Sequence, residues 1–302
     1  MSRGRIMGPW VGICWLLSHV AWAQDSASLP SADSKPGEEI EEVSEVRQLP
    51  ASGAWNPEMF PVLDRVSNLL TPSPQRRRSL VFTIDHRPFQ RLTRQTFRDW
   101  FGFDAGALKV GLGLRLGLLD GLDVGVARLN GTGEIFDVYQ FDARYRLLAQ
   151  SRAFCNLAVR AGITWFYQPD FEDASGYFAE WLLDRAFFGR LTVGAGLSFH
   201  SSSSGATKSN QDTKPSLAVL AWTEVRLLSF LAWNLEMAAP VAGFRQTYPA
   251  LTTALKFLSH RHTFSLLLSN TQYISVDGLA AGSNRDLGDL IFGFTILREF
   301  EL

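Results

Sequence analysis

The sequence predicts an all-β fold, a closed antiparallel transmembrane β-barrel of about twelve strands with a short N-terminal helix. Three observations predict it: apolar residues alternate with small or polar ones after residue 76, the connections alternate in length, and Gly (25), Phe (22) and Trp (9) are abundant. The 302 residues are 46% hydrophobic, which excludes disordered and collagen-like polymers. The balance of 29 basic against 30 acidic side chains gives no positive excess for nucleic acid.

The first 23 residues have the pattern of a signal peptide. Arg3 and Arg5 precede an uncharged segment that closes with Ala21-Trp22-Ala23, the small-x-small pattern that signal peptidases cleave. We expect export with cleavage after Ala23, and an uncleaved anchor helix is the alternative. Cleavage removes Cys14 and leaves Cys155 as the single cysteine, so no internal disulfide is expected.

Two further segments precede the expected barrel. Residues 24–54 are acidic and poor in large apolar side chains, which predicts a disordered tether. Residues 55–75 predict a short amphipathic helix and a linker, after which the barrel occupies residues 76–302. The helix could plug or cap the barrel mouth, or simply cover an apolar rim. Its apolar positions at helical spacing are Trp55, Met59, Val62, Leu63, Val66 and Leu70.

Period-two alternation marks the expected strands. It is clearest over residues 108–118, where Leu or Val alternates with Lys109, Arg115 and glycines, and Asp120-Gly121 then signals a tight hairpin. Most segments reach the roughly 9–11 residues that a tilted strand needs to cross a membrane. The predicted strands are residues 79–86, 107–118, 122–129, 134–148, 152–167, 177–186, 190–200, 215–228, 230–240, 247–258, 262–271 and 288–300.

The connections between these strands favour a membrane barrel. After the signal segment no uncharged apolar run is long enough for a spanning helix, so only a closed barrel satisfies the backbone in hydrocarbon. A large exported β-sandwich or calycin-like barrel is the soluble alternative. In a soluble barrel the apolar face of the strands would point inward, and twelve strands enclose more space than these side chains fill. Short connections are expected in the periplasm, at 119–121, 149–151, 187–189, around Ser229 and at 259–261, and long ones outside, at 87–106, 168–176, 201–214 and 272–287.

Short motifs recur in a fixed order along the expected barrel. They are His86-Arg87-Pro88-Phe89, Trp100-Phe101-Gly102-Phe103-Asp104, the segments 119–125 and 262–271, and the closing segment 292–300. In this order they resemble a bacterial outer-membrane β-barrel family catalogued only as a domain of unknown function, from which Pro88 and Ser269 are departures. The resemblance implies an outer-membrane barrel with no established activity and no assigned catalytic residues.

Seven positive and six negative side chains lie on the polar face of the predicted strands, which is expected to point into the barrel. One interpretation is a polar pathway for small solutes with a slight preference for anions, and the other is a narrow lumen filled by cross-strand salt bridges. Arg144 and Arg146, about 7 Å apart on one strand face, could clamp a carboxylate or phosphate, or pair with neighbouring acids. The candidate lumen-lining residues are Lys109, Arg115, Asp123, Asp142, Arg144, Arg146, Arg160, Glu180, Asp184, Glu224, Arg226, Glu236 and Lys256.

Motifs for catalysis or for a cofactor are missing from the sequence. A Ser–His hydrolase site, for instance with His200 and Ser198, is the enzymatic alternative, but no Gly-x-Ser-x-Gly elbow accompanies it. No haem, phosphate-loop or dinucleotide motif is present, and His260 with His262 is a weak metal pair better explained by turn solvation. We therefore expect no enzyme, no cofactor and no metal site.

Aromatic residues indicate the expected surroundings of the barrel. The closing strand carries Phe292, Phe294, Ile296 and Phe300 in the alternation that outer-membrane assembly machinery recognises. Expected partners are outer-membrane lipid, that machinery and a periplasmic protein bound by the N-terminal segment, with no nucleic acid. The favoured function is porin-like passage of small polar or anionic solutes in the bacterial outer membrane, and the alternative is a closed anchor or partner-binding scaffold. Belt candidates are Trp100, Trp165, Trp181, Trp222, Trp233, Tyr139, Tyr145 and Tyr177, of which Trp222 has inward parity.

Overall fold

The computed structural model describes residues 64–302 except 93–107, 131–136, 169–172, 204–213 and 260. The chain divides into two units, Met1–Ala51 and Ser52–Leu302, and every described residue belongs to the second. The predicted signal peptide, the tether and residues 55–63 of the predicted helix lie outside the described residues. Among the described residues, no helix is long and apolar enough to span a bilayer.

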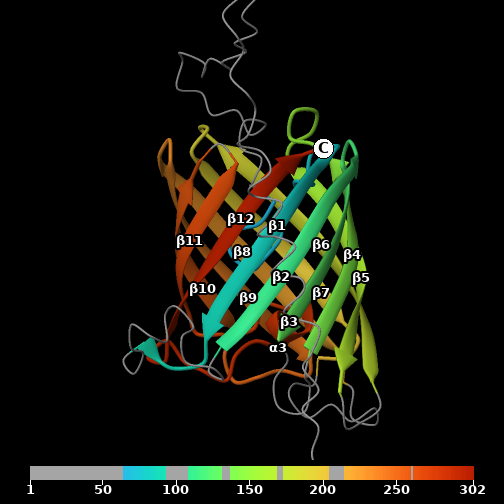
Figure 1. Cartoon of the computed structure of the whole chain (residues 1–302), viewed down its shortest axis with the longest axis vertical. Helices are drawn as coiled ribbons and strands as arrows, with labels where there is room; N and C mark the ends of the chain where they lie inside the picture. Colours follow the sequence, from blue (N-terminus) through green and yellow to red (C-terminus); the bar gives the residue numbers. More distant parts are fainter. Residues whose placement is uncertain (1–63, 93–107, 131–136, 169–172, 204–213, 260) are drawn as a thin grey trace, which may run out of the picture. The chain divides into compact units, whose positions relative to one another are not determined.

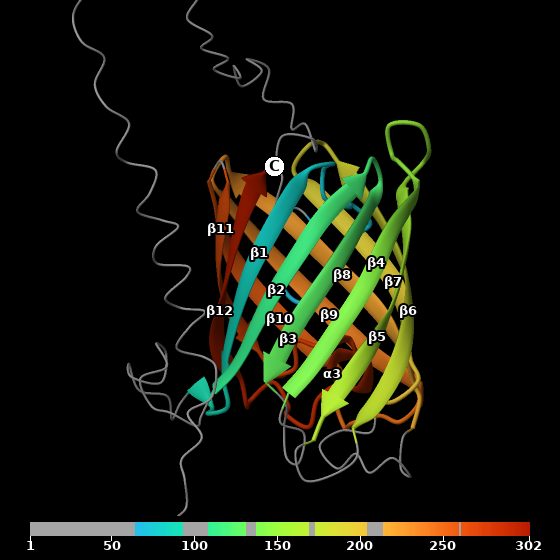
Figure 2. The same ribbon diagram turned by 45° about the vertical axis from the view of Figure 1, so that its right-hand side comes forward.

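Twelve antiparallel strands form one closed barrel, as predicted (Figures 1 and 2). Each strand pairs with its neighbours in sequence, and β1 pairs with β12 from Ser79↔Glu301 to His86↔Phe294 to close the ring. The strands are β1 (Ser79–Pro88), β2 (Leu108–Leu119), β3 (Leu122–Asn130), β4 (Asp137–Leu148), β5 (Asn156–Tyr167), β6 (Ala174–Phe187), β7 (Leu191–His200), β8 (Ser216–Leu228), β9 (Leu231–Gly243), β10 (Ala250–Leu258), β11 (His262–Ser269) and β12 (Ile291–Glu301).

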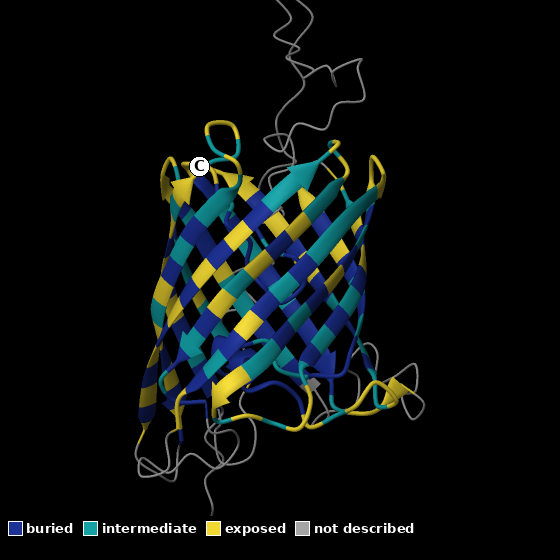
Figure 3. Cartoon of the chain, turned by 180° about the vertical axis from the view of Figure 1, so that it is seen from behind, coloured by how far each residue is buried: buried dark blue, intermediate teal, exposed yellow. Residues whose placement is uncertain are grey.

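Buried and exposed residues alternate along the strands, which gives the barrel wall a chequered pattern in Figure 3. In β2, Lys109 and Arg115 are buried, whereas Leu114 and Leu118 are 44% and 43% exposed. Successive side chains of a strand point to opposite faces. The alternation seen in the sequence therefore places the polar set inside the barrel and the apolar set outside.

The two ends of the barrel differ in their connections. Short turns at 120–121, 188–190, 229–230 and 259–261 define the short-turn end, which also carries the C-terminus (Figure 1). The opposite, long-loop end carries the connections 89–107, 131–136, 168–173, 201–215, 244–249 and 270–290.

One expected short turn is wrong. Instead of 149–151, the connection between β4 and β5 spans residues 149–155, because residues 150–155 form turns and bends before β5 begins at Asn156. Cys155, which falls inside the predicted strand 152–167, therefore lies half-buried in this connection.

Aromatic side chains occupy much of the outer face. Trp165 and Tyr177 are 41% and 63% exposed near the long-loop end, and Tyr145 is 50% exposed near the short-turn end. Trp181, at 53%, also faces outward, and Trp233 is half-buried with its Nε1 donating to Thr253 Oγ1 at 2.9 Å. Trp222 is only 4% exposed and lies inside, as its parity predicted.

The predicted N-terminal helix is wrong over its described part. Residues Asp64–Thr71 form a tight turn that we call the lumen hairpin: Arg65 and Leu70 bridge, Val66 N donates to Leu69 O, and Thr71 N donates to Asp64 O, both at 2.8 Å. A helix would pair most of its backbone groups internally, whereas here wall side chains bind the N–H groups of Ser67, Asn68 and Leu69 and carbonyl groups of both arms. The apolar spacing that suggested a helix instead packs three side chains of the turn into the lumen.

Candidate functional site: the barrel lumen

Two segments of the chain fill the described lumen. The lumen hairpin occupies it from the short-turn end, where both of its arms lie beside Arg144. From the long-loop end, the β11–β12 connection folds inward and carries the short helix α3 (Val276–Ala281), all of whose residues are buried. Helix α3 lies against β7, β8 and β9. The lumen is thus occupied from both ends.

The hairpin and α3 meet in an apolar cluster inside the barrel. It contains Val66, Leu69 and Leu70 of the hairpin and Leu279 of α3. The wall completes the cluster with small and large side chains that face inward, namely Leu182, Leu220, Trp222, Ala238 and Ala250. Burial of this apolar surface stabilises both insertions against the wall of β6, β8, β9 and β10.

The main chain of the hairpin is held by the carboxylate of Glu236 on β9. Glu236 accepts hydrogen bonds from the backbone N–H groups of Ser67, Asn68 and Leu69 at 2.9–3.1 Å, and from Asn68 Nδ2 at 2.7 Å. Consecutive backbone N–H groups that converge in this way form an anion-binding nest. The buried carboxylate of Glu236 thereby fixes the tip of the hairpin to the wall.

The carbonyl groups of the hairpin are held by cationic side chains. Arg144 on β4 donates from Nη1 to Asp64 O at 2.9 Å and to Thr71 O at 2.7 Å, so one guanidinium joins the two arms. Lys256 on β10 donates from Nζ to Arg65 O at 2.8 Å. The wall therefore recognises the hairpin mainly through its main chain, which is bonded at both donors and acceptors.

Charged side chains of alternating sign form a continuous chain along one wall. It runs over β4, β3, β2, β4, β5 and β6, and its ion-pair contacts lie at or below 2.9 Å. At its end Ser198 on β7 donates to Glu180 at 3.0 Å. Charges paired in this way satisfy one another and are not free to bind a solute. The order is Arg144, Asp123, Arg115, Asp142, Arg160 and Glu180.

A second charged group, on β1, is absent from the sequence-based candidates. Arg87 is fully buried and donates to Asp85 Oδ1 at 3.2 Å, to Thr295 Oγ1 at 3.0 Å and to Asn68 Oδ1 at 2.9 Å. Asp85 also pairs with Arg65 of the hairpin at 3.2 Å. The predicted strand ended at residue 86, but its alternation continues to Arg87 and would have placed both residues inside.

The remaining inward candidates have local partners. Lys109 lies 4.7 Å from the ring centroid of Tyr273 in the β11–β12 connection. Asp184 accepts a hydrogen bond from Asn156 at 2.8 Å. Glu224 on β8 forms an ion pair with Lys256.

Arg146 and Arg226 do not join the lumen network. Both are half-buried at the short-turn end, and each adjoins a β-bulge where its strand changes register, next to Leu148 and Leu228 respectively. Arg226 donates to the carbonyl of Ser229 at 2.6 Å, within the turn. Each bulge lies on the turn side of its arginine, so Arg146 and Arg226 keep the inward parity but stand at the rim of the barrel. Arg144 and Arg146 therefore do not form the anion clamp that their spacing suggested.

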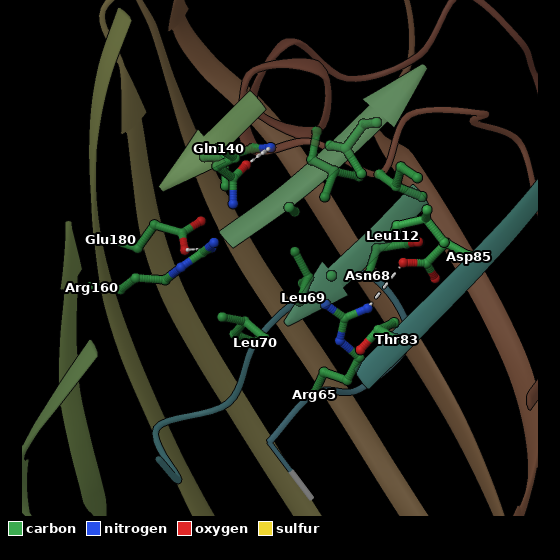
Figure 4. Close-up of a pocket in the computed structure, with 16 residues that line it drawn as sticks. Arg65, Asn68, Leu69, Leu70, Thr83, Asp85, Leu112, Gln140, Arg160 and Glu180 are labelled. Atoms are coloured by element: carbon green, nitrogen blue, oxygen red, sulfur yellow. Dashed lines mark hydrogen bonds and ion pairs between the residues drawn. The ribbon is translucent and has the colours of Figure 1, made fainter. Parts of the chain in front are cut away.

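A cavity of about 50 Å³ lies between the hairpin, the wall and the β11–β12 connection. Figure 4 shows Arg160 with Glu180 and Arg65 with Asp85 around this space, together with Leu69 and Leu70. At roughly 10–15 Å³ for each water molecule, it holds a few waters and no larger solute.

The histidine and serine candidates for hydrolysis are separated by their contacts. His200 Nδ1 accepts from the backbone N–H of Ser202, and its Nε2 lies 3.0 Å from Thr164 Oγ1. The Ser198 hydroxyl donates to Glu180 instead. Within the described part of the chain, no cluster of three or more His, Cys, Asp or Glu side chains is arranged to hold a metal ion.

Comparison with known proteins identifies the family. Residues 64–300 match the membrane-bound beta barrel domain family DUF5777. The chain belongs to this family. The match begins at Asp64, so the lumen hairpin is part of the family domain, and the resemblance to a β-barrel family of unknown function is confirmed. The DUF5777 chain is also similar to a solved NanC porin, with a TM-score of 0.43 and 10% identity over 74% of this chain and 99% of that chain. No curated protein matches.

Proposed function

We propose that this DUF5777 chain is a barrel of the bacterial outer membrane for porin-like, passive passage of small polar solutes, with the lumen hairpin as its plug. One observation carries the proposal: the hairpin shares no β-ladder with the described wall. Its single β-bridge joins Arg65 to Leu70 within the hairpin, and the twelve-strand ring closes without it. The hairpin can therefore leave the lumen while every strand pairing stays in place.

The outer-membrane location is supported by the surface of the barrel. Its outer face carries large apolar and aromatic side chains, which is typical of strands that contact hydrocarbon. The outward alternation of Phe292, Phe294, Ile296 and Phe300 on β12 suits recognition by the outer-membrane assembly machinery. Short turns of outer-membrane barrels face the periplasm, so in the proposed arrangement the short-turn end lies on the periplasmic side.

The structure supports passage of small polar solutes better than it supports a preference for anions. A preference for anions would require free guanidinium groups in the lumen. Arg144, Arg115 and Arg160 are instead paired with acidic residues of the wall. Small polar solutes need only a hydrated lumen lined by charged groups.

A second function, a closed membrane anchor or scaffold, is favoured by the small cavity and by the many bonds that hold the hairpin. In this alternative the hairpin stays in place, and the N-terminal segment binds a periplasmic partner.

Single-channel recording in a planar bilayer tests passage. We expect brief openings from the refolded chain and long openings from a Leu69→Asp/Leu70→Asp variant, because two carboxylates in the apolar cluster expel the hairpin. Silence from both proteins, each shown to be folded by heat-modifiable gel migration, overturns passage. Silence from the unmodified chain alone, with conduction by the variant, favours the closed scaffold.

A further inference from the structure

Five cationic side chains of the barrel wall pair with acidic residues that also belong to the wall, and these pairs do not involve the hairpin. These partners are Asp85 for Arg87, Asp123 and Asp142 for Arg115, Asp123 for Arg144, Asp142 and Glu180 for Arg160, and Glu224 for Lys256. Removal of the hairpin therefore breaks none of these pairs. These five positive charges therefore stay neutralised by the wall, and Lys109 on β2 keeps its contact with Tyr273 of the β11–β12 connection.

Glu236 behaves differently. Each hydrogen bond that its carboxylate accepts within the described residues comes from the hairpin, from three backbone N–H groups and from Asn68 Nδ2. Glu236 is only 3% exposed, and it lies on β9 at the level of the hairpin tip. Departure of the hairpin leaves this carboxylate facing the lumen without its four donors.

Neighbouring charges do not compensate for this loss. Arg87 lies nearby and also loses its bond to Asn68, but it remains paired with Asp85. If Arg87 moved toward Glu236, one guanidinium would face two carboxylates. Departure of Arg65 of the hairpin also removes a positive partner from Asp85. The region around Glu236 therefore carries net negative charge in either arrangement.

We infer that Glu236 is the selectivity-determining residue of the emptied lumen and that it favours small cations, including amine-bearing solutes, over anions. The inference rests on the proposed function and names its solute class. In the plugged state the backbone nest of the hairpin neutralises Glu236, so the same carboxylate anchors the plug and selects the solute. A charged side chain in a pore wall acts on permeant ions through this local field.

The test compares reversal potentials across a KCl gradient in the open background, Leu69→Asp/Leu70→Asp, with and without Glu236→Gln. Low salt keeps screening weak, since the Debye length is about 10 Å at 0.1 M. We expect a preference for K⁺ over Cl⁻ that falls about twofold or more with Glu236→Gln. The control is Glu301→Gln, which removes a carboxylate that is 77% exposed at the rim, and it should leave the ratio unchanged.

The outcomes separate this inference from the proposed function. A conducting barrel that prefers anions, or whose K⁺/Cl⁻ ratio is the same with Glu236 and with Gln, overturns the role of Glu236 while passage stands. Because Leu69→Asp/Leu70→Asp introduces negative charge, the comparison is repeated in a second background with residues 65–70 replaced by Gly and Ser. This background also serves if the first variant does not fold. Folded barrels that stay silent in both backgrounds overturn passage and the inference with it.

Discussion

Arg144 and Asp123 form an ion pair whose two side chains are completely buried, and the same guanidinium holds both arms of the lumen hairpin. One residue thus links the wall of β3 and β4 to the plug. Asp123 in turn accepts from the backbone N–H of Gln75 at 2.7 Å, where the chain leaves the hairpin toward β1. The pair therefore belongs to the architecture of the plugged state rather than to a free anion site.

Substitution Arg144→Ala should destabilise the folded barrel strongly. The substitution removes one of the two guanidinium groups that pair with Asp123, and it leaves the buried carbonyl groups of Asp64 and Thr71 without their donor. Loss of one partner of a buried ion pair costs about 3–5 kcal/mol. Arg146→Ala, two residues further along the same strand, is the matched control and should change the free energy of unfolding by about 0.5 kcal/mol or less. Urea unfolding followed by tryptophan fluorescence measures both. Equal losses would mean that the Arg144 network does not stabilise the barrel.

The sequence was informative where lipid and lumen impose opposite demands on alternate residues. The outer face of the strands carries apolar side chains and the inner face mainly polar, charged or small ones, so period two was visible in the sequence, and the predicted strand count was confirmed. The bulges beside Arg146 and Arg226 could not be predicted from this alternation, since parity carries no information about an inserted residue.

The lumen hairpin could not be predicted from the sequence for a different reason. Its apolar residues have near-helical spacing, and its conformation depends on wall residues distant in sequence, such as Glu236, 168 positions after Asn68. Such contacts follow from the closed ring and its register rather than from local propensity. The pairing of Arg115 and Arg160 with Asp142 across three strands likewise required the register.

Gly194 on β7 should be intolerant of a side chain. A Cβ atom there would lie 1.9 Å from Cε2 of Trp222, whose ring is buried over this position. Gly194→Ala should therefore displace Trp222 from the apolar cluster and destabilise the barrel by about 1–3 kcal/mol. Gly113→Ala is the control, because its added Cβ has no neighbour nearer than 3.6 Å. The midpoint of urea unfolding and the tryptophan emission maximum measure the effect. If Gly194→Ala changed neither quantity, the packing of Trp222 over Gly194 would be contradicted.

The hairpin should be protected from thiol reagents while it plugs the lumen. Ser67 is 2% exposed, so Ser67→Cys in a Cys155→Ser background should react slowly with a maleimide. Leu69→Asp/Leu70→Asp should raise the rate by about tenfold or more, since each 1.4 kcal/mol lost from the closed state gives a factor of ten. Leu287→Cys, at a position that is 63% exposed, supplies the rate for an open site. Fast labelling of Ser67→Cys in the otherwise unmodified chain would show that the hairpin does not rest in the lumen.

Cys155 provides a test of orientation in the membrane. It lies in the connection 149–155 at the short-turn end, which faces the periplasm in the proposed arrangement. A membrane-impermeant maleimide should therefore leave Cys155 unmodified on intact cells and label it once the outer membrane is permeabilised. Leu287→Cys in the Cys155→Ser background, located in the long 270–290 connection, should label on intact cells. The opposite labelling pattern would show that the barrel has the inverse orientation in the membrane. The hairpin would then enter the lumen from the cell surface.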